Sequence, residues 1–185
     1  AHTINGSNIN DFIQGNDGAD TLNGRDGDDT IFGGTAGGVI DSSADKINGG
    51  DGNDSLHGEA GNDTINGGLD HDRLVGNQGT DSLIGGPGSD LFYFAVADLQ
   101  AGVRDTITDH GGGIADLIRF DGVQYYQVNA TAVSATSALL AVNGAEVILD
   151  LTAWVSWGRD PAGLSTTQCE YLMPVRAFEN GVWVA

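Results

Sequence analysis

The sequence has few of the features that fold or anchor a chain in the usual ways. Its only cysteine, Cys169, excludes an internal disulfide. Lysine and arginine number 7 against 26 acidic residues, and the formal net charge is -19. Such a surface repels nucleic acid and anionic lipid and attracts cations, so we expect no nucleic-acid partner. We expect no transmembrane segment, because no hydrophobic run approaches membrane-spanning length, and no secretory signal opens the chain.

Catalytic motifs are also missing. The sequence contains no G-x-S-x-G nucleophile elbow, no HExxH zinc helix, no P-loop and no Rossmann glycine motif. The HGGG at residues 110–113 is better interpreted as a turn, and the EF-hand template fails because Leu56 stands where that loop needs glycine. The four histidines are scattered, and we expect each to be solvated. We therefore expect no enzymatic activity from these 185 residues.

Glycine and acid are concentrated in the first half of the chain. Residues 6–93 hold 21 of the 30 glycines and 16 of the 26 acidic residues, whereas most aromatic residues follow position 90. A glycine-rich, acidic segment of this kind would by default be disordered, because it has too little apolar surface to offset the entropy of ordering. An internal repeat is the alternative to that interpretation.

The first half divides into nine contiguous units of nine residues, one of which carries seven extra. They read GSNINDFIQ, GNDGADTLN, GRDGDDTIF, GGTAGGVIDSSADKIN, GGDGNDSLH, GEAGNDTIN, GGLDHDRLV, GNQGTDSLI and GGPGSDLFY. The sixth position is always aspartate, namely Asp11, Asp20, Asp29, Asp45, Asp54, Asp63, Asp72, Asp81 and Asp90. The eighth is always a large apolar residue: Ile13, Leu22, Ile31, Ile47, Leu56, Ile65, Leu74, Leu83 and Phe92. Chance does not produce this register.

This repeat predicts an all-β fold, a right-handed parallel β-roll. The glycines permit tight GGxGxD turns, and the last three residues suit a very short strand with one inward side chain. With two units per coil, turns 18 residues apart lie above one another, and the eighth-position residues form a thin core. We place this roll in residues 1–93.

Stacking would bring the aspartates of successive coils into a crowded file of like charge. Carboxylates a few Å apart repel one another, so a cation must lie between them. The ligands on offer are carboxylate and carbonyl oxygens, which select calcium over zinc or copper. Calcium is favoured over magnesium because the loops are adaptable and magnesium keeps its waters.

The units resemble the calcium-binding nonapeptide GGxGxDxUx of the RTX (repeats-in-toxin) exoproteins. The resemblance implies that each calcium ion bridges two turns one coil apart. The lower turn would give the carbonyls of its second and fourth positions and its aspartate, and the upper turn the carbonyls of its first and third positions and its aspartate. The sites so implied combine Arg25, Gly27 and Asp29 with Gly49, Asp51 and Asp54; Gly50, Gly52 and Asp54 with Gly67, Leu69 and Asp72; Glu59, Gly61 and Asp63 with Gly76, Gln78 and Asp81; and Gly68, Asp70 and Asp72 with Gly85, Pro87 and Asp90. By the same rule Gly24 and Asp26 serve the third turn, and Gly58 and Ala60 the sixth.

Nine turns paired in this way hold at most seven ions. The first unit departs from the pattern at Ser7 and Ile9, so its site is expected to be weak or to act as a cap. The insertion of the fourth unit, around residues 37–44, must loop out of the coil. Asp41 within it is either a replacement ligand or plain loop, and the sequence favours loop.

Residues 94–185 predict a different, β-rich region that caps the roll. Short apolar or alternating runs such as LFYFAV, DLIRF, SALLAV and AEVILDLTAW are separated by Gly, Asn and Asp. Segments of the DTITD type follow the repeats in RTX proteins and can hold a further calcium ion. By that resemblance Asp105 and Asp109 are candidate ligands, the alternative being turn or cap aspartates.

The resemblance also implies a biological setting. RTX proteins leave Gram-negative bacteria by type I secretion and fold in external calcium, so we expect a secreted module whose partners are calcium and that secretion machinery. Because the chain starts almost directly in the repeats, we expect it to be part of a longer exoprotein or toxin. The alternative is a glycan-binding or adhesive module that recognises a polysaccharide or cell surface, suggested by Tyr125, Tyr126, Trp154 and Trp157.

Overall fold

The computed structural model describes residues 1–35, 41–95, 97–108, 116–121, 128–134, 137–142 and 145–150. Asp109 and the four aromatic residues from Tyr125 to Trp157 lie outside these ranges. The described residues form strands and no helix, so none of them belongs to a helix that could cross a membrane. The strands are β1 (Thr3–Asn5), β2 (Phe12–Gln14), β3 (Thr21–Asp26), β4 (Thr30–Phe32), β5 (Lys46–Asp51), β6 (Ser55–Ala60), β7 (Thr64–Leu69), β8 (Arg73–Gln78), β9 (Ser82–Ile84), β10 (Leu91–Ala95), β11 (Arg104–Thr108), β12 (Leu117–Asp121), β13 (Val128–Ser134), β14 (Ser137–Val142) and β15 (Ala145–Asp150).

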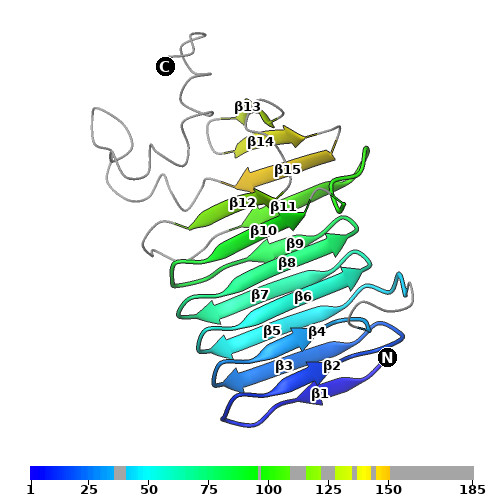
Figure 1. Cartoon of the computed structure of the whole chain (residues 1–185), viewed down its shortest axis with the longest axis vertical. Helices are drawn as coiled ribbons and strands as arrows, with labels where there is room; N and C mark the ends of the chain where they lie inside the picture. The colour runs from blue at the N-terminus through cyan, green and yellow to red at the C-terminus, as the bar shows by residue number, and fades with distance from the viewer. Residues whose placement is uncertain are drawn as a thin grey trace.

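Two sheets face each other, and the chain alternates between them along the repeats. One sheet has the strand order β1-β3-β5-β7-β9-β11-β15-β14-β13, and the other has the order β12-β10-β8-β6-β4-β2. Neighbouring strands of the repeats are parallel, and each residue pairs with the residue one coil further along the chain, as Leu56 does with Leu74. Figure 1 shows the strands as successive rungs from the blue N-terminal end upward. The predicted parallel β-roll is confirmed.

The core is a single file of apolar residues between the sheets. Every eighth-position residue is buried, and Leu22, Ile31, Leu56, Ile65, Leu74 and Leu83 have no exposed surface. The core continues beyond the repeats through Phe94, Leu99, Ile107 and Val147. Because the repeats supply one buried apolar side chain per nine residues, apart from the seventh, which also buries Val75, this part of the molecule has little hydrophobic stabilisation per residue.

Several strands are longer than the three residues expected from sequence. The strands β3, β5, β6, β7 and β8 each have six residues. Their extra length comes from the turns, where second- and third-position residues also pair, as Gly50 does with Gly68. The paired segments therefore continue from each short strand into the turn, although turn residues such as Gly50 and Gly68 have positive φ values of 127° and 123°.

The roll geometry extends past residues 6–93 at both ends. β1 pairs with β3, so residues 2–5 occupy the last four positions of a preceding unit. After the repeats, β11 pairs with β9 and β12 pairs with β10, again in parallel. The boundary expected at residue 93 falls inside β10. Antiparallel pairing begins only among β13, β14 and β15.

Candidate metal centres between the turns

Backbone carbonyls of each turn face the turn one coil above. The second-position residue Gly50 has a φ of 127°, and a Cβ there would collide with the carbonyl oxygen of Arg25. A Cβ on the fourth-position Gly52 would likewise collide with the carbonyl oxygen of Gly27. Glycine at these positions lets the carbonyls of the lower turn approach the upper turn closely.

The upper turn points two carbonyls back down. A Cβ on Gly24 would lie 2.5 Å from the carbonyl oxygen of Gly49, and Gly27 N–H donates to the carbonyl oxygen of Asp51 over 2.8 Å. The four predicted backbone ligands of this site therefore face one gap. The other three predicted sites repeat this hydrogen bond to a third-position carbonyl. Gly52 N–H donates to Leu69 over 3.4 Å, Gly61 N–H to Gln78 over 2.9 Å, and Asp70 N–H to Pro87 over 3.0 Å.

The sixth-position aspartates form two files, one along each edge of the roll. In each file the N–H of one aspartate donates to Oδ1 of the aspartate one coil above. One file joins Asp11, Asp29, Asp54, Asp72, Asp90 and Asp116 by bonds of 2.7–2.9 Å. The other joins Asp20, Asp45, Asp63, Asp81 and Asp105 by bonds of 2.7–2.8 Å. These bonds fix the carboxylate orientation along the whole stack.

The second oxygen of these carboxylates lacks a donor. Among the described residues, Oδ2 is buried without a hydrogen-bond partner in Asp20, Asp29, Asp54, Asp63, Asp72 and Asp81. Such a group costs about 1–3 kcal/mol, and more when it is charged, unless something else satisfies it. A set of orphaned oxygens repeated at this spacing points to a missing positive partner.

Those orphaned oxygens lie beside carbonyl oxygens of the neighbouring turn. A Cβ added to the first-position Gly49 would collide both with Oδ2 of Asp54 and with the carbonyl oxygen of Gly67. The same convergence occurs at Gly24, Gly58 and Gly67. Two negative oxygens meeting at one point are favourable only with a cation between them, and the glycine leaves the space for it.

Burial of the files raises the pKa of their carboxyl groups. Desolvation is the largest cause, opposed by the N–H bond from the neighbouring aspartate and reinforced by nearby carboxylates. It raises the pKa of Asp63 to about 8, of Asp72 and Asp81 to about 7, and of Asp54 and Asp105 to about 6. The pKa values of Asp29 and Asp45 are raised for the same first reason. Without a bound cation, ionising these files is therefore unfavourable near neutral pH.

The first repeat, for which Ser7 and Ile9 predict a weak site or a cap, differs from the others in the partner of its aspartate. Oδ2 of Asp11 accepts hydrogen bonds from the N–H and hydroxyl of Ser7, at 2.6 and 2.9 Å. Ile9 at the fourth position is 70% exposed. The oxygen that is orphaned in six other aspartates is thus satisfied here.

Beyond the repeats, the structure brings one predicted residue into a file and adds another. Asp105 is 3% exposed, and its Oδ1 accepts from Asp81 N–H. Asp116 was not predicted as a site residue, yet its Oδ1 accepts from Asp90 N–H. The signal in the sequence was Asp116 followed two residues later by Ile118, as in the repeats, and preceded by Gly111 and Gly112 at the first and second turn positions, with Ile114 in place of the fourth-position glycine. Asp109 is outside the described residues.

The predicted third- and fourth-position acids contribute backbone, not side chains. Asp26, Asp51 and Asp70 have exposed side chains, while the carbonyls of Asp51 and Asp70 face the gaps. In the part of the chain that the structure describes, no three His, Cys, Asp or Glu side chains cluster as a metal site. Most available donors are carbonyls, and an all-oxygen set of this kind suits a hard cation of the calcium type.

Comparison with known proteins gives one match. The model of a family described as RTX calcium-binding nonapeptide repeat (4 copies) matches residues 5–38, 39–74 and 67–95. No curated protein sequence matches the chain.

Proposed function

Since residues 5–95 belong to the family of RTX calcium-binding nonapeptide repeats, we propose that this chain is a non-catalytic module that folds when calcium binds between its turns. The observation that carries the proposal is the convergence of a buried, unpartnered Oδ2 with a carbonyl oxygen at gap after gap. Bound calcium would supply the positive charge on which these oxygens converge.

The proposed ligands follow the facing groups. At the gap between the third and fifth turns they are the carbonyls of Arg25, Gly27, Gly49 and Asp51 with the carboxylates of Asp29 and Asp54. The three other sites use the equivalent groups of their turns. Each inner aspartate, meaning one with a neighbour on both sides in its file, takes part in two sites, because it lies above one gap and below the next.

Calcium binding and folding are coupled in this proposal. The calcium-free roll would bury files of like charge around a thin apolar core, so its folded state is poorly stabilised. Ion binding that is possible only in the folded state adds its free energy to folding. Extracellular calcium modules typically bind at roughly 10⁻⁴–10⁻³ M, which suits a chain that stays unfolded in a calcium-poor cytosol.

We further propose that the parent protein is exported by type I secretion and folds outside the cell. The support is the family of the repeats together with the net charge of -19, which keeps the calcium-free chain expanded. In this role the module needs no catalytic residue of its own.

The test is a circular-dichroism titration of the full chain with calcium, after excess chelator, with magnesium as the matched control ion. We expect a largely unfolded spectrum in chelator and a cooperative gain of β-structure at submillimolar to millimolar calcium. Magnesium should be much less effective. A spectrum already native-like in chelator would refute the proposal.

A second candidate function, glycan binding, is favoured by a row of side chains on the outer face of the six-stranded sheet. The rings of Phe32 and His57 stack with centroids 4.6 Å apart. The guanidinium of Arg73 lies 4.6 Å from the Tyr93 ring centroid, and that of Arg119 lies 5.8 Å from it. Aromatic rings that stack on sugars and guanidinium groups that pair with carboxylates together suit an acidic polysaccharide.

His57 does not fit its expected solvated state. It is half-buried, and it accepts a hydrogen bond from Arg73 over 3.1 Å. Burial, and then the charge of Arg73, lower the pKa of His57 to about 4, so the ring is neutral at pH 7. A glycan array with the calcium-loaded chain tests this second candidate. Binding lost in Tyr93→Ala and Arg73→Gln, but kept in Lys46→Gln on the other sheet, would support it; no binding would remove it.

A further inference from the structure

The fourth repeat keeps the contacts of an ordinary turn before and after its insertion. A Cβ on Gly33 would lie 2.6 Å from Oδ2 of Asp45 and 2.7 Å from the carbonyl oxygen of Gly58, the neighbours expected for a first-position glycine. The carbonyl oxygen of Ser43 abuts Gly61, as the fourth-position carbonyl of Gly27 abuts Gly52. The first and fourth positions are thus kept, and Asp41 precedes the fourth-position Ser43 by two residues.

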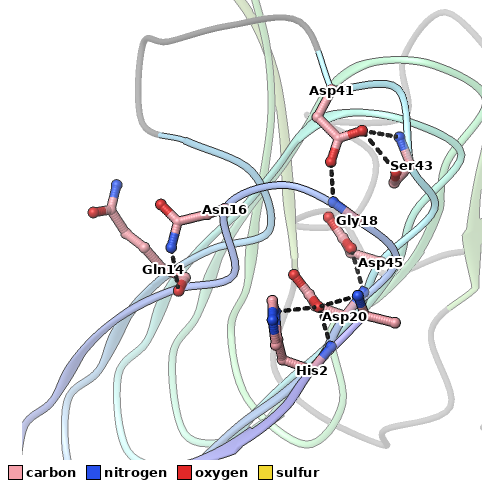
Figure 2. A network of polar contacts seen from close by, with 9 residues as sticks. His2, Gln14, Asn16, Gly18, Asp20, Asp41, Ser43 and Asp45 are labelled. Carbon is pink, nitrogen blue, oxygen red and sulfur yellow. Dashed lines mark hydrogen bonds and ion pairs between the residues drawn. The ribbon is translucent and has the colours of Figure 1, made fainter.

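Asp41 accepts the hydrogen bond that a third-position carbonyl accepts in the ordinary turns. In ordinary turns a fourth-position N–H donates to the third-position carbonyl one coil above, as Gly27 does to Asp51 over 2.8 Å. The equivalent N–H in the second repeat belongs to Gly18, and it donates to Oδ2 of Asp41 (Figure 2). A carboxylate oxygen therefore lies where other gaps have a neutral carbonyl.

The carboxylate of Asp41 is held in that position from the other side. Its Oδ1 accepts from the N–H of Ser43 over 3.1 Å and from the Ser43 hydroxyl over 2.6 Å, as Figure 2 shows. Ser43 in turn is the fourth-position residue of the same turn. The orientation of Asp41 is thus fixed by the frame of the roll.

The gap that Asp41 borders contains a buried carboxylate oxygen without a hydrogen-bond partner among the described residues, although the other oxygen of the same carboxylate, Oδ1 of Asp20, accepts from His2 N–H. Asp20 is 2% exposed, and its Oδ2 has no hydrogen-bond partner among the described residues. A Cβ on Gly15 would lie 2.8 Å from this oxygen and would collide with the carbonyl oxygen of Gly33. Asp45 closes the gap from above, since its Oδ1 accepts from Asp20 N–H over 2.7 Å.

We propose that the carboxylate of Asp41 is a calcium ligand between the second and fourth turns, in place of a backbone carbonyl. The inference rests on the proposed calcium binding and distinguishes one site from the rest. The number of negatively charged ligands is one of the factors that set calcium affinity. Because this site has one more carboxylate than the others, its calcium ion is the most tightly bound of the roll. The insertion thus adds one negative charge at the gap between the second and fourth turns.

The test compares Asp41→Asn with Asp17→Asn in the full chain. Asparagine at position 41 keeps an oxygen acceptor and loses the charge. Asp17 is a matched control because it is the third-position residue of the second repeat, has an exposed side chain and loses the same charge. Calcium binding is measured by isothermal titration calorimetry, with the number of bound ions counted by equilibrium dialysis.

We expect Asp41→Asn to weaken binding of the tightest calcium ion about tenfold or more and Asp17→Asn to leave the binding of all calcium ions unchanged. If wild type binds calcium and both variants match it, the role of Asp41 is overturned while the proposed function stands. If wild type binds no calcium, both are overturned. Should Asp41→Asn fail to fold, a wild-type crystal soaked with a lanthanide decides. An anomalous peak at about 2.3–2.6 Å from an Asp41 carboxylate oxygen supports the proposal, and a peak elsewhere in the gap overturns it.

Discussion

The N–H of Asp54 donates to Oδ1 of Asp72 over 2.9 Å, while Oδ2 of Asp72 is buried without any hydrogen-bond partner among the described residues. One oxygen of the carboxylate is thus used to stack the turns, and the other is left for a different partner.

Asp54→Asn should raise the calcium concentration at the midpoint of folding about tenfold or more, because Asp54 is shared by two of the proposed sites. Asparagine keeps the acceptor for Asp29 N–H, so the loss is one of charge at the gaps. Circular dichroism during calcium titration measures the midpoint. Asp70→Asn, in the turn one coil above but with an exposed side chain, is the control and should leave the midpoint within about twofold. Equal midpoints for both variants would contradict the shared role of Asp54.

Gly49→Ala should destabilise the calcium-loaded roll by roughly 1–3 kcal/mol, because the new methyl group collides with Oδ2 of Asp54 and the carbonyl oxygen of Gly67. Urea unfolding at saturating calcium measures the change. Gly34→Ala is the comparison, since a Cβ there meets only the Glu59 side chain, at 3.3 Å, and the expected cost is small. An unchanged urea midpoint for Gly49→Ala would show that this space is not needed.

Acid should promote folding of the calcium-free chain. The folded-state pKa values of Asp54, Asp63, Asp72 and Asp81, about 6 to 8, lie above the ordinary aspartate value of 3.8. Groups shifted in this direction contribute stability that is fully present below pH 4 and is lost as the pH rises through 6 to 8. In chelator we therefore expect more β-structure at pH 5 than at pH 8 by circular dichroism.

The pH dependence should reverse when calcium is present. Calcium binds the ionised carboxylates, so protons compete with it and the midpoint calcium concentration should rise as the pH falls from 8 to 5. Calcium titrations at the two pH values measure this. If the midpoint is the same at both, the buried aspartates are not the groups that bind the ion.

Leu56→Ala should cost about 2–5 kcal/mol of unfolding free energy at saturating calcium, because Leu56 is fully buried in the single apolar file. Leu69→Ala is the control, since Leu69 is 45% exposed at a turn and contributes its carbonyl, which alanine keeps. Urea denaturation followed by circular dichroism measures both. A similar loss in the two variants would mean that the file between the sheets does not stabilise the roll in the way its burial indicates.

The repeat register made much of this fold predictable. Once Asp54 and Asp72 are aligned at 18 residues, the pairing of Leu56 with Leu74 and the burial of both follow from the periodicity of strands. The carbonyl directions do not follow from glycine, because glycine widens the choice of backbone angles and the second-position residues Asn16, Arg25, Glu59 and Asn77 have positive φ without it. The assignment of individual calcium ligands remains a prediction.

Other features could not be derived from the pattern. Asp116 enters a file after the segment GGGIA, which matches the repeat turn at its first two positions but has Ile114 in place of the fourth-position glycine, so the pattern marked it only in part. For the insertion, sequence alignment does not say which turn position absorbs the added residues, and so the place of Asp41 depended on the contacts of Gly33 and Ser43. Both cases depend on contacts between segments whose sequences break the repeat.

Because each inner aspartate borders two gaps, the proposed ions along one edge are not independent. Filling one gap orients a carboxylate that the next gap also uses, so binding should be cooperative along each file, in the manner of a one-dimensional nearest-neighbour chain. The effect of losing an aspartate on calcium binding then depends on its position within the file as well as on the lost charge. Loss of an end aspartate shortens a file by one site, whereas loss of Asp54 or Asp63 divides it into two shorter stretches, each with fewer neighbours to reinforce it.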